Sequence, residues 1–544
     1  MPKILINEID RTSAGTPGEY SNNTVLICGF AKRTNEAIIE AMEQDPTVGY
    51  TLPDENGIFE FYSKNDFVDT IGEVSPILSE DNHSLAHYGN QMAYELLSQG
   101  YPSVIYRSLG IVPGTEAEIV AALKSISDAD FWDIFKDKAS YDFRFVTHGL
   151  LSACNTHDVA TLDQAQKEAE NALDAAQTTL ETAQTALDEL MESAGYNAES
   201  AEAKAANKAV TDAQTAVTKA ETAYNKAKTA YDNATVNCFT ESDFEGANEA
   251  IIGLAVYAKQ TEDYEAVPGT GRGDCVALVE INEAKYVNDT PGRPEAKILA
   301  AAEKMSYITA DNGPYCACTV PSVVYKMTPK AEFGNNMTFP GAFHYLACYK
   351  RMIDSNFAEW YAAAGYTRGV SSYTIDHTTV KLGEVAIQAL EPRYKRAAPY
   401  NYKMPFAVNV IANFRGSYYL WGNRTCDLLD EFAGGGDLTA QHFLNIRHLC
   451  TTIKKQLYVS CRRFTFDPNS DVLWINFKNS ITPTLDRMKA DQGVRDYKIE
   501  KVYTDKKATL RAKVRIVPIE AVEDFVLEIS LEDSLGDTAV TITE

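Results

Sequence analysis

The residues that could do chemistry in this chain are its histidines, its cysteines and one glycine-rich segment. An enzyme needs titratable groups that converge on one site, and a metalloprotease, nucleophile-elbow or phosphate-loop motif is the usual sign of one. The chain has none of these motifs, and its eight histidines are dispersed: His83, His87, His148, His157, His344, His377, His442 and His448. The sequence therefore predicts no enzyme, no catalytic residue and no cofactor.

His148 and Cys154 lie close enough in sequence to be considered as a base and its nucleophile. Such a pair needs a third group that orients the base, and none is indicated nearby. We interpret His148 as a loop histidine that is bonded by its neighbours.

The ten cysteines are scattered from Cys28 to Cys461. In a large chain without an export signal they are expected to be reduced and buried. Cys316 and Cys318 form the one close pair, and a structural zinc site would need a second pair or nearby histidines. The pattern predicts no metal centre.

The segment 269–273, GTGRG, has the glycines of a phosphate-binding loop but lacks its lysine and hydroxyl residue, and it precedes a strand rather than a helix. The adhesion-type triplet Arg272-Gly273-Asp274 overlaps it. A glycine-rich turn before a buried strand at 275–281 explains both.

Length and charge narrow the class of protein. A chain of 544 residues is expected to form two to four domains. Its formal charge of −26 argues against a nucleic-acid-binding surface, which needs a basic footprint. No apolar run reaches the roughly 18–20 residues that span a bilayer, so we expect no membrane insertion. Residues 1–10 lack the apolar core of a signal peptide, which predicts folding in a cytoplasm.

One basic cluster stands out in this acidic chain. Residues 438–460 have the pattern of an amphipathic helix, with an apolar stripe that includes Phe443 and Ile453. Its basic residues lie off that stripe or follow it: Arg447, Lys454, Lys455, Arg462 and Arg463. They could be a solvated helix end, where cations are favourable, or a surface that binds an acidic protein.

Both ends of the chain carry short alternating segments. Residues 3–9 contain Ile4 and Ile6, and residues 538–543 contain Val540 and Ile542. Loop-like stretches separate each segment from the rest of the chain. Such tethered strands are suited to pairing with another chain, and the alternative is an ordinary edge strand.

Between these ends, apolar runs alternate with helical patterns. Strands are predicted at 24–30, 103–107, 141–147 and 275–281, and helices at 85–97 and 244–259. This alternation is typical of an α/β sheet covered by helices. A later helix is predicted to bury Leu473, Phe477 and Ile481, and to end or kink at Pro483.

A heptad pattern interrupts the α/β region from Leu162 to Ala234. Its first arm repeats Leu173, Leu180 and Leu187, and the positions between these are occupied by Ala169, Ala176, Ala183 and Leu190. After Gly195 the second arm repeats Ala203, Val210, Val217, Tyr224 and Tyr231. The pattern predicts an antiparallel coiled-coil hairpin that projects into solvent from a loop of the α/β domain.

Four blocks follow one another between residues 406 and 499: FAVNVIANF, YYLWGNRT, LNIRHLCTTIKKQLYVSCRRFTFDPNSDVLW and RDYKI. They resemble the C-terminal core of contractile tail sheath proteins. That family has an N-x-I strand, a W-G-x-R-T turn, an N-x-R-R helix and an F-x-P-N-x-x-x-x-W helix start. The matching residues are Asn409, Trp421, Gly422, Arg424, Thr425, Asn445, Arg447, Phe466, Asn469 and Trp474. His448 departs from the pattern, since the family often has a second arginine there.

The resemblance is close over the last 140 or so residues and looser over residues 1–110 and 240–385, where Gly365, Arg368 and Gly369 match a family turn. It implies an α/β, multidomain α+β fold with a sheath-type C-terminal core, terminal arm strands, an inserted α/β domain and the hairpin insertion. The expected divisions are 1–23, N-terminal arm strand and linker; 24–110, N-terminal part of the sheath core; 111–160 with 237–385, inserted α/β domain; 161–236, hairpin; 386–533, C-terminal core; and 534–544, C-terminal arm strand.

The resemblance also implies a function and partners. A sheath protein of a bacteriophage polymerises helically around a tail tube, and contraction drives that tube through the host envelope during genome delivery. The implied partners are copies of the chain itself, the tube protein, the baseplate and the tail terminator, with no direct nucleic-acid contact. The implied location is the virion tail, assembled in the host cytoplasm, and the basic cluster becomes a candidate tube contact.

Two alternatives stay open. The same sheath could belong to a phage-derived injection device or bacteriocin. A different class, a coiled-coil adhesin or surface-layer protein, is favoured by the hairpin and opposed by the lack of a signal peptide. The family pattern contains no such hairpin, so the resemblance says nothing about its role.

Overall fold

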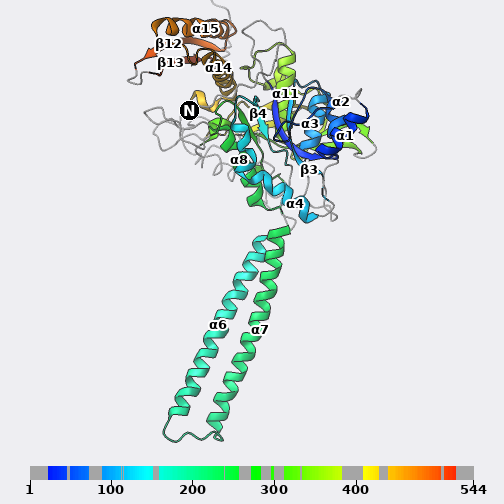
Figure 1. Cartoon of the computed structure of the whole chain (residues 1–544). Coiled ribbons are helices and arrows are strands. Elements are labelled where there is room, and N and C mark those ends of the chain that lie inside the picture. The colour runs from blue at the N-terminus through cyan, green and yellow to red at the C-terminus, as the bar shows by residue number, and fades with distance from the viewer. Residues whose placement is uncertain are drawn as a thin grey trace, which may run out of the picture.

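A computed structural model describes residues 23–45, 50–72, 88–111, 113, 116–150, 159–237, 239–256, 271–283, 296–298, 312–330, 334–382, 408–427, 439–503 and 508–521. Three parts of the molecule can be distinguished in Figure 1: a central body, a smaller C-terminal unit at one end and a long helical hairpin at the other. Both predicted arm strands, with Ile4, Ile6, Val540 and Ile542, lie outside the described residues, as does the alternating segment 525–531.

An eight-stranded mixed sheet forms the centre of the body, in the order β11-β10-β6-β5-β4-β1-β3-β2. The six inner strands run parallel to their neighbours, while β2 and β11 are antiparallel at the two edges. The strands are β1 (Val25–Ala31), β2 (Ile58–Phe61), β3 (Val104–Ile111), β4 (Phe145–Thr147), β5 (Val276–Val279), β6 (Cys316–Val320), β10 (Asn409–Phe414) and β11 (Ser417–Trp421). The predicted α/β class is confirmed. The expected domain limits at residues 111 and 386 fall between strands of this one sheet.

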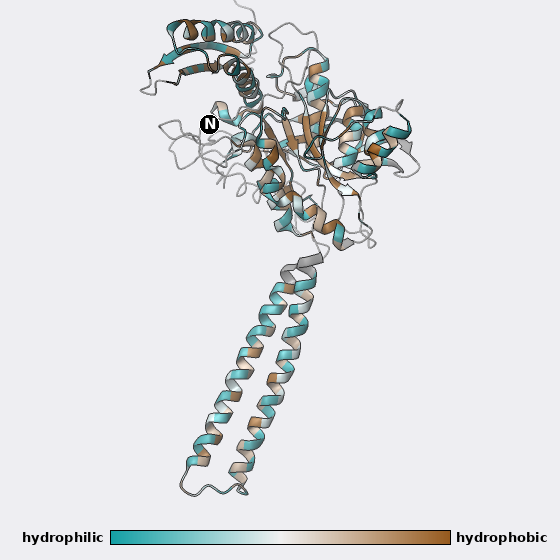
Figure 2. Ribbon diagram, in the orientation of Figure 1, coloured by the Kyte–Doolittle hydropathy of each residue, from teal (hydrophilic) through white to brown (hydrophobic). Residues whose placement is uncertain are grey.

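Side chains alternate between the two faces of the sheet, and each face is covered by helices. In β1, Leu26 and Cys28 pack toward one cluster, and Val25 and Ile27 toward the other. The first cluster is closed by α4 (Glu116–Lys124), α5 (Ala129–Asp133) and α8 (Glu241–Ala255). The second is closed by α1 (Asn35–Gln44), α2 (Lys64–Thr70), α3 (Gly89–Ser98) and α11 (Gly341–Asp354). Figure 2 shows the strands between these layers as the most hydrophobic part of the molecule.

A second, three-stranded antiparallel sheet flanks α11. It has the order β8-β7-β9 and consists of β7 (Val323–Lys330), β8 (Gly334–Phe339) and β9 (Ile375–Thr378). The short helix α12 (Gly365–Arg368) ties the following segment to β11, because Leu420 N–H donates to Gly369 O at 2.7 Å. A side chain at position 369 would meet Leu420 O at 2.4 Å, so this close approach requires glycine.

The C-terminal unit consists of α14 (Leu444–Arg463), α15 (Asp471–Ala490) and a two-stranded sheet of β12 (Val494–Val502) and β13 (Arg511–Pro518). Its own small core contains Leu449 and Ile453 of α14 with Leu485 and Met488 of α15. Of the two outcomes expected at Pro483, an end or a kink, the end is wrong, since the helix continues to Ala490. Ile481 and Leu485, on either side of the proline, are both buried, and this packing holds the helix together across the missing N–H.

Two long helices form the hairpin, α6 (Val159–Glu192) and α7 (Ala201–Asn237), and they lie side by side (Figure 1). Their less exposed positions recur at the heptad spacing seen in the sequence. In α6 these positions include Leu173, Leu180 and Leu187, and in α7 they include Ala203 and Ala213, which are buried. The outer faces are hydrophilic (Figure 2).

Candidate functional site

The residues that match the sheath pattern meet where β10, the turn after β11 and the start of α14 come together. Asn409 is fully buried at the start of β10, and its amide donates to Arg424 O at 2.9 Å and Cys318 O at 3.1 Å. Its carbonyl oxygen accepts from Arg424 N–H at 2.7 Å. One asparagine side chain therefore satisfies three buried backbone groups on two segments.

A second asparagine pair fixes the start of α14 to this turn. Asn423 donates to Asn445 Oδ1 at 2.7 Å, and Asn445 N–H donates back to Asn423 Oδ1 at 3.1 Å. Thr425 Oγ1 donates to Gln441 O at 2.8 Å. The exchange satisfies a backbone donor in the first turn of α14, which lacks a partner within the helix.

Two further motif residues shape the same turn. A side chain on Gly422 would lie 2.9 Å from both Cα and Oδ1 of Asn409, so glycine is needed there. The Arg424 guanidinium lies 4.7 Å from the ring centroid of Phe443. Trp421 packs with Tyr366 and Phe414 at centroid distances of 5.2 and 4.9 Å.

Asn469 and Trp474 lie outside this cluster. Asn469 belongs to the loop before α15 and donates to Thr509 O at a long 3.4 Å. Trp474 is on α15, with its ring 6.1 Å from that of Phe477. These two residues therefore belong to the C-terminal unit rather than to the turn.

Three of the five predicted tube-contact residues make contacts inside the chain. Lys455 is buried, and its ammonium group bonds the Asp142 carboxylate and, at 2.8 Å, Phe143 O. The Arg447 guanidinium lies over the Tyr315 ring at 4.4 Å. Lys454 donates to Gly273 O at 2.9 Å, and burial lowers its pKa to about 8. In the isolated chain these three residues join α14 to the body.

Arg462 and Arg463 remain at the accessible end of α14. Arg463 is exposed, and Arg462 is half-buried with its guanidinium 5.7 Å from the Tyr458 ring. These two arginines are the part of the predicted cluster that another protein could reach.

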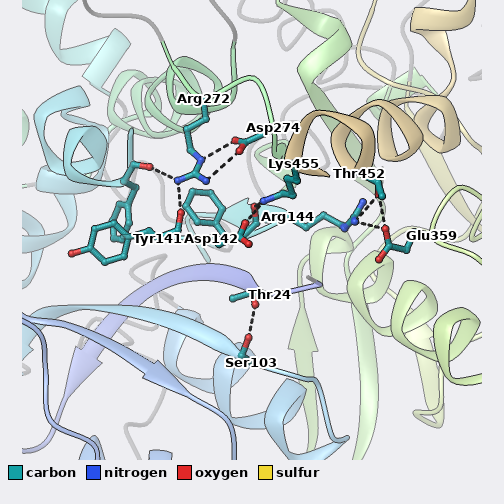
Figure 3. Close-up of polar contacts among 12 residues, drawn as sticks. Thr24, Ser103, Tyr141, Asp142, Arg144, Arg272, Asp274, Glu359, Thr452 and Lys455 are labelled. Carbon is teal, nitrogen blue, oxygen red and sulfur yellow. Dashed lines mark hydrogen bonds and ion pairs between the residues drawn. The ribbon is translucent and has the colours of Figure 1, made fainter. Parts of the chain in front are cut away.

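At the joint between α14 and the body, sequence reasoning missed one arginine. Arg144, directly before β4, is fully buried and donates to Glu359 Oε2 at 2.5 Å, to Thr452 Oγ1 at 2.9 Å and to His448 O at 3.3 Å (Figure 3). The neighbouring Glu359 carboxylate helps to raise its pKa. The strand-like YDFRFVT sequence gave no sign of a partner 215 residues away.

A second buried arginine holds the turn that the glycine-rich motif predicts. Arg272 pairs with Asp274, with Nε 2.9 Å from Oδ1, and donates to Phe135 O and Tyr141 O, each at 2.7 Å. Arg272 and Asp274 point toward each other (Figure 3), and both are buried, so the Arg-Gly-Asp triplet is not accessible to an adhesion partner.

Two buried histidines, His448 and His148, have lowered pKa values and accept or donate hydrogen bonds inside the body. His448 Nε2 lies 2.5 Å from Tyr345 Oη, and burial together with Arg144 lowers its pKa well below the usual range. His148 Nε2 lies 3.0 Å from Asn248 Oδ1, and burial lowers its pKa to about 4. Cys154, its possible nucleophile, lies outside the described residues.

No group of three or more His, Cys, Asp or Glu side chains in the described part of the chain is placed to hold a metal ion. None of the helices described has the length and hydropathy that a membrane span requires.

No protein-family model matches the chain, and no curated protein matches it. Among solved structures, a chain of the anti-feeding prophage baseplate aligns with 98% of this chain and 99% of its own length, at 11% identity and a TM-score of 0.46. A chain of the sheath complex of an extracellular contractile injection system, in the contracted state, aligns with 49% of this chain and 66% of its own, at 16% identity and a TM-score of 0.35. The likeness is loose and assigns no partner to this chain. The chain is thus similar to one structure described as a prophage baseplate and to another described as a contractile sheath.

Proposed function

We propose that the chain is the sheath subunit of a contractile tail or of a phage-derived injection device. In this proposal, copies polymerise helically around a tube, and contraction of the polymer drives the tube through an envelope. The chain works as a structural element and carries out no catalysis.

One observation carries the proposal: the residues that match the sheath motifs belong to one hydrogen-bonded junction in the folded chain. Asn409, Arg424, Thr425 and Asn445 were selected from the sequence because they match the sheath pattern. They also form the hydrogen-bonded junction between the central sheet and α14. A chance match of short motifs would not be expected to select side chains that meet in space.

The joint between α14 and the body is the part of the molecule that contraction would have to rearrange in this proposal. The C-terminal unit is attached to the body through α14, by the Lys455–Asp142 ion pair and by hydrogen bonds from Arg144 to Thr452 and His448 O. Buried pairs fix one arrangement strictly, because any displacement leaves a charge unpaired at a cost of several kcal/mol. Such a joint holds the unit in one position relative to the body, and in the proposal contraction breaks these contacts.

The two-stranded sheet offers a place for subunits to join. Among the described residues, β12 pairs only with β13, so each strand has one open edge. Open edges accept an added strand from another chain. In the proposal, a terminal arm of one copy, 3–9 or 538–543, adds to β12 or β13 of a neighbour.

The charge of the C-terminal unit supports an acidic partner. Residues 439–521 contain 16 Lys and Arg against 8 Asp and Glu, whereas the whole chain has a net charge of −26. We place the tube contact at the accessible arginines Arg462 and Arg463. Three apolar side chains beside them are also exposed, Phe466 at 83%, Val472 at 64% and Ile475 at 53%. They add an apolar component to the proposed contact.

Electron microscopy of the purified protein at rising concentration tests the proposal. We expect hollow, helically striated tubes, either alone or after co-expression with a tube protein. A uniform monomer under both conditions would contradict it. Replacing Arg462→Glu together with Arg463→Glu should abolish assembly on the tube, while the matched pair Arg487→Glu and Lys489→Glu, two exposed residues near the end of α15, should leave assembly on the tube intact.

A further inference from the structure

Two cations of α14 lie over one aromatic ring of the body. Arg447 and Lys454 are seven residues apart on the helix, which is about two turns, so they share one of its faces. The ring belongs to Tyr315, the last residue of the short helix η3 (Gly313–Tyr315) before β6. Its centroid lies 4.4 Å from the Arg447 guanidinium and 5.3 Å from the Lys454 ammonium. Two positive charges therefore converge where α14 meets the body.

Arg447 is almost completely buried, and its guanidinium lacks an acceptor. The residue is 8% exposed, and its Nε is buried without a hydrogen-bond partner. Among the described residues, the guanidinium forms neither an ion pair nor a hydrogen bond. An unpaired buried charge is costly, so buried arginines normally have a carboxylate partner. Arg144 has Glu359 and Arg272 has Asp274, and Arg447 departs from this rule.

Arg447 also acts on the charge of its neighbour. Lys454 donates to Gly273 O at 2.9 Å, and burial, followed by the positive charge of Arg447, lowers the pKa of Lys454 to about 8. At about pH 7 Lys454 is therefore still mainly protonated, and the two side chains repel each other. The opposing effect of Asp274 is small, and its carboxylate is paired with Arg272. A negative group between the two cations would remove this repulsion.

We propose that Arg447 and Lys454 together bind one tetrahedral oxyanion of the phosphate class. The planar guanidinium can donate two parallel hydrogen bonds to two oxygens of such an anion, and the ammonium group supplies a second, compact charge. A divalent anion there neutralises both cations and gives Arg447 the acceptor that the described part of the chain does not supply. Because both cations also contact Tyr315, binding strengthens the attachment of α14 to the body.

The charge of the whole chain makes this site distinguishable from non-specific binding. A net charge of −26 repels anions at long range, so an anion is not expected to collect on the chain in general. The exposed Arg463 can attract one, but interactions of exposed cations are weak and are screened by salt. Arg447 is buried and already desolvated, so binding there should persist at physiological salt.

Isothermal titration calorimetry of the full-length chain with inorganic phosphate, at about pH 7 and physiological salt, tests the site. We expect saturable binding of one phosphate per chain. Replacing Arg447→Gln together with Lys454→Gln should raise the Kd about tenfold or more, because the charged donors are lost. The matched control is Arg487→Gln together with Lys489→Gln, which removes two exposed cations from α15 and should leave the Kd unchanged. Circular dichroism checks the fold of each variant.

Arg447→Lys decides the question if the double variant does not fold. It keeps a cation over Tyr315 but loses the planar fork, so the Kd should rise about fivefold. Sulfate should displace phosphate, and acetate should not. The site is overturned if wild type shows no saturable binding or if Arg447→Lys binds phosphate as wild type does, and equal displacement by acetate would overturn the phosphate class. The titration uses the chain in solution, so its result does not depend on whether the proposed sheath forms.

Discussion

At the scale of single residues, Arg144 is the side chain on which the joint depends most. Replacing Arg144→Met should destabilise the protein by about 3–5 kcal/mol, since Glu359 would be left buried and unpaired. Urea denaturation followed by tryptophan fluorescence measures the change. The exposed Arg463→Met is the control and should shift the midpoint little. Equal stability of the two variants would show that Arg144 is not essential to the joint.

Also at the scale of residues, His148 makes the stability of the folded protein depend on pH. Its Nδ1 accepts from Leu150 N–H at 3.1 Å, so the neutral ring carries its proton on Nε2 and bonds Asn248. Burial lowers the pKa of His148 in the folded state to about 4, below the usual histidine pKa of 6.5, so the unfolded state binds more protons between these values. The contribution to stability is complete above pH 6.5 and is lost as pH falls toward 4.

The variant His148→Gln should therefore show a smaller loss of stability than wild type between pH 6.5 and 4. The difference should be about 3 kcal/mol, from roughly two and a half pKa units. Urea midpoints measured across this range test it. The exposed His377→Gln serves as control, and equal slopes for His148→Gln and wild type would rule out the assignment.

At the scale of elements, the hairpin should be dispensable for folding. Its seam is formed by its own two helices, from Leu173 and Leu187 of α6 to Ala203 and Ala213 of α7. Excision of 160–236 with a short linker should leave the body folded, with a loss of helix signal that matches the hairpin alone. Circular dichroism measures this, and loss of strand signal as well would contradict the insertion.

Local periodicity explains which elements were predictable. The heptad leucines mark the positions at which α6 is least exposed, and apolar runs place β1 and β5 within a few residues of their observed limits. Sheet order was not predictable in this way, because β6 pairs with β10 across a long intervening segment. The cluster around Asn409 was predictable only through family resemblance, and the partners of Arg144 and Lys455 only from the folded chain, because they lie 215 and 313 residues away.

At the scale of the whole molecule, the distribution of charge separates two surfaces of the C-terminal unit. Arg462, Arg463 and the exposed Phe466 lie at the end of α14 and the start of α15, and they are assigned to the tube. Lys498, Lys513 and Arg515 lie on the outer face of β12–β13. The acidic remainder of the chain repels other copies, so association depends on these specific contacts.

The terminal arms provide the last test at this scale. Strict alternation at 538–543 predicts a strand that pairs with a neighbour, and within the described residues β12 and β13 each have one edge without a paired strand, where it can add. Deleting 536–544 should therefore leave a folded monomer that cannot build long tubes, because backbone hydrogen bonds between subunits are lost. Electron microscopy at a concentration that gives wild-type tubes measures this. The matched control replaces Thr541→Ser within the arm, which retains every backbone donor and should assemble normally. Long tubes from the truncated chain would contradict strand donation by the C-terminal arm.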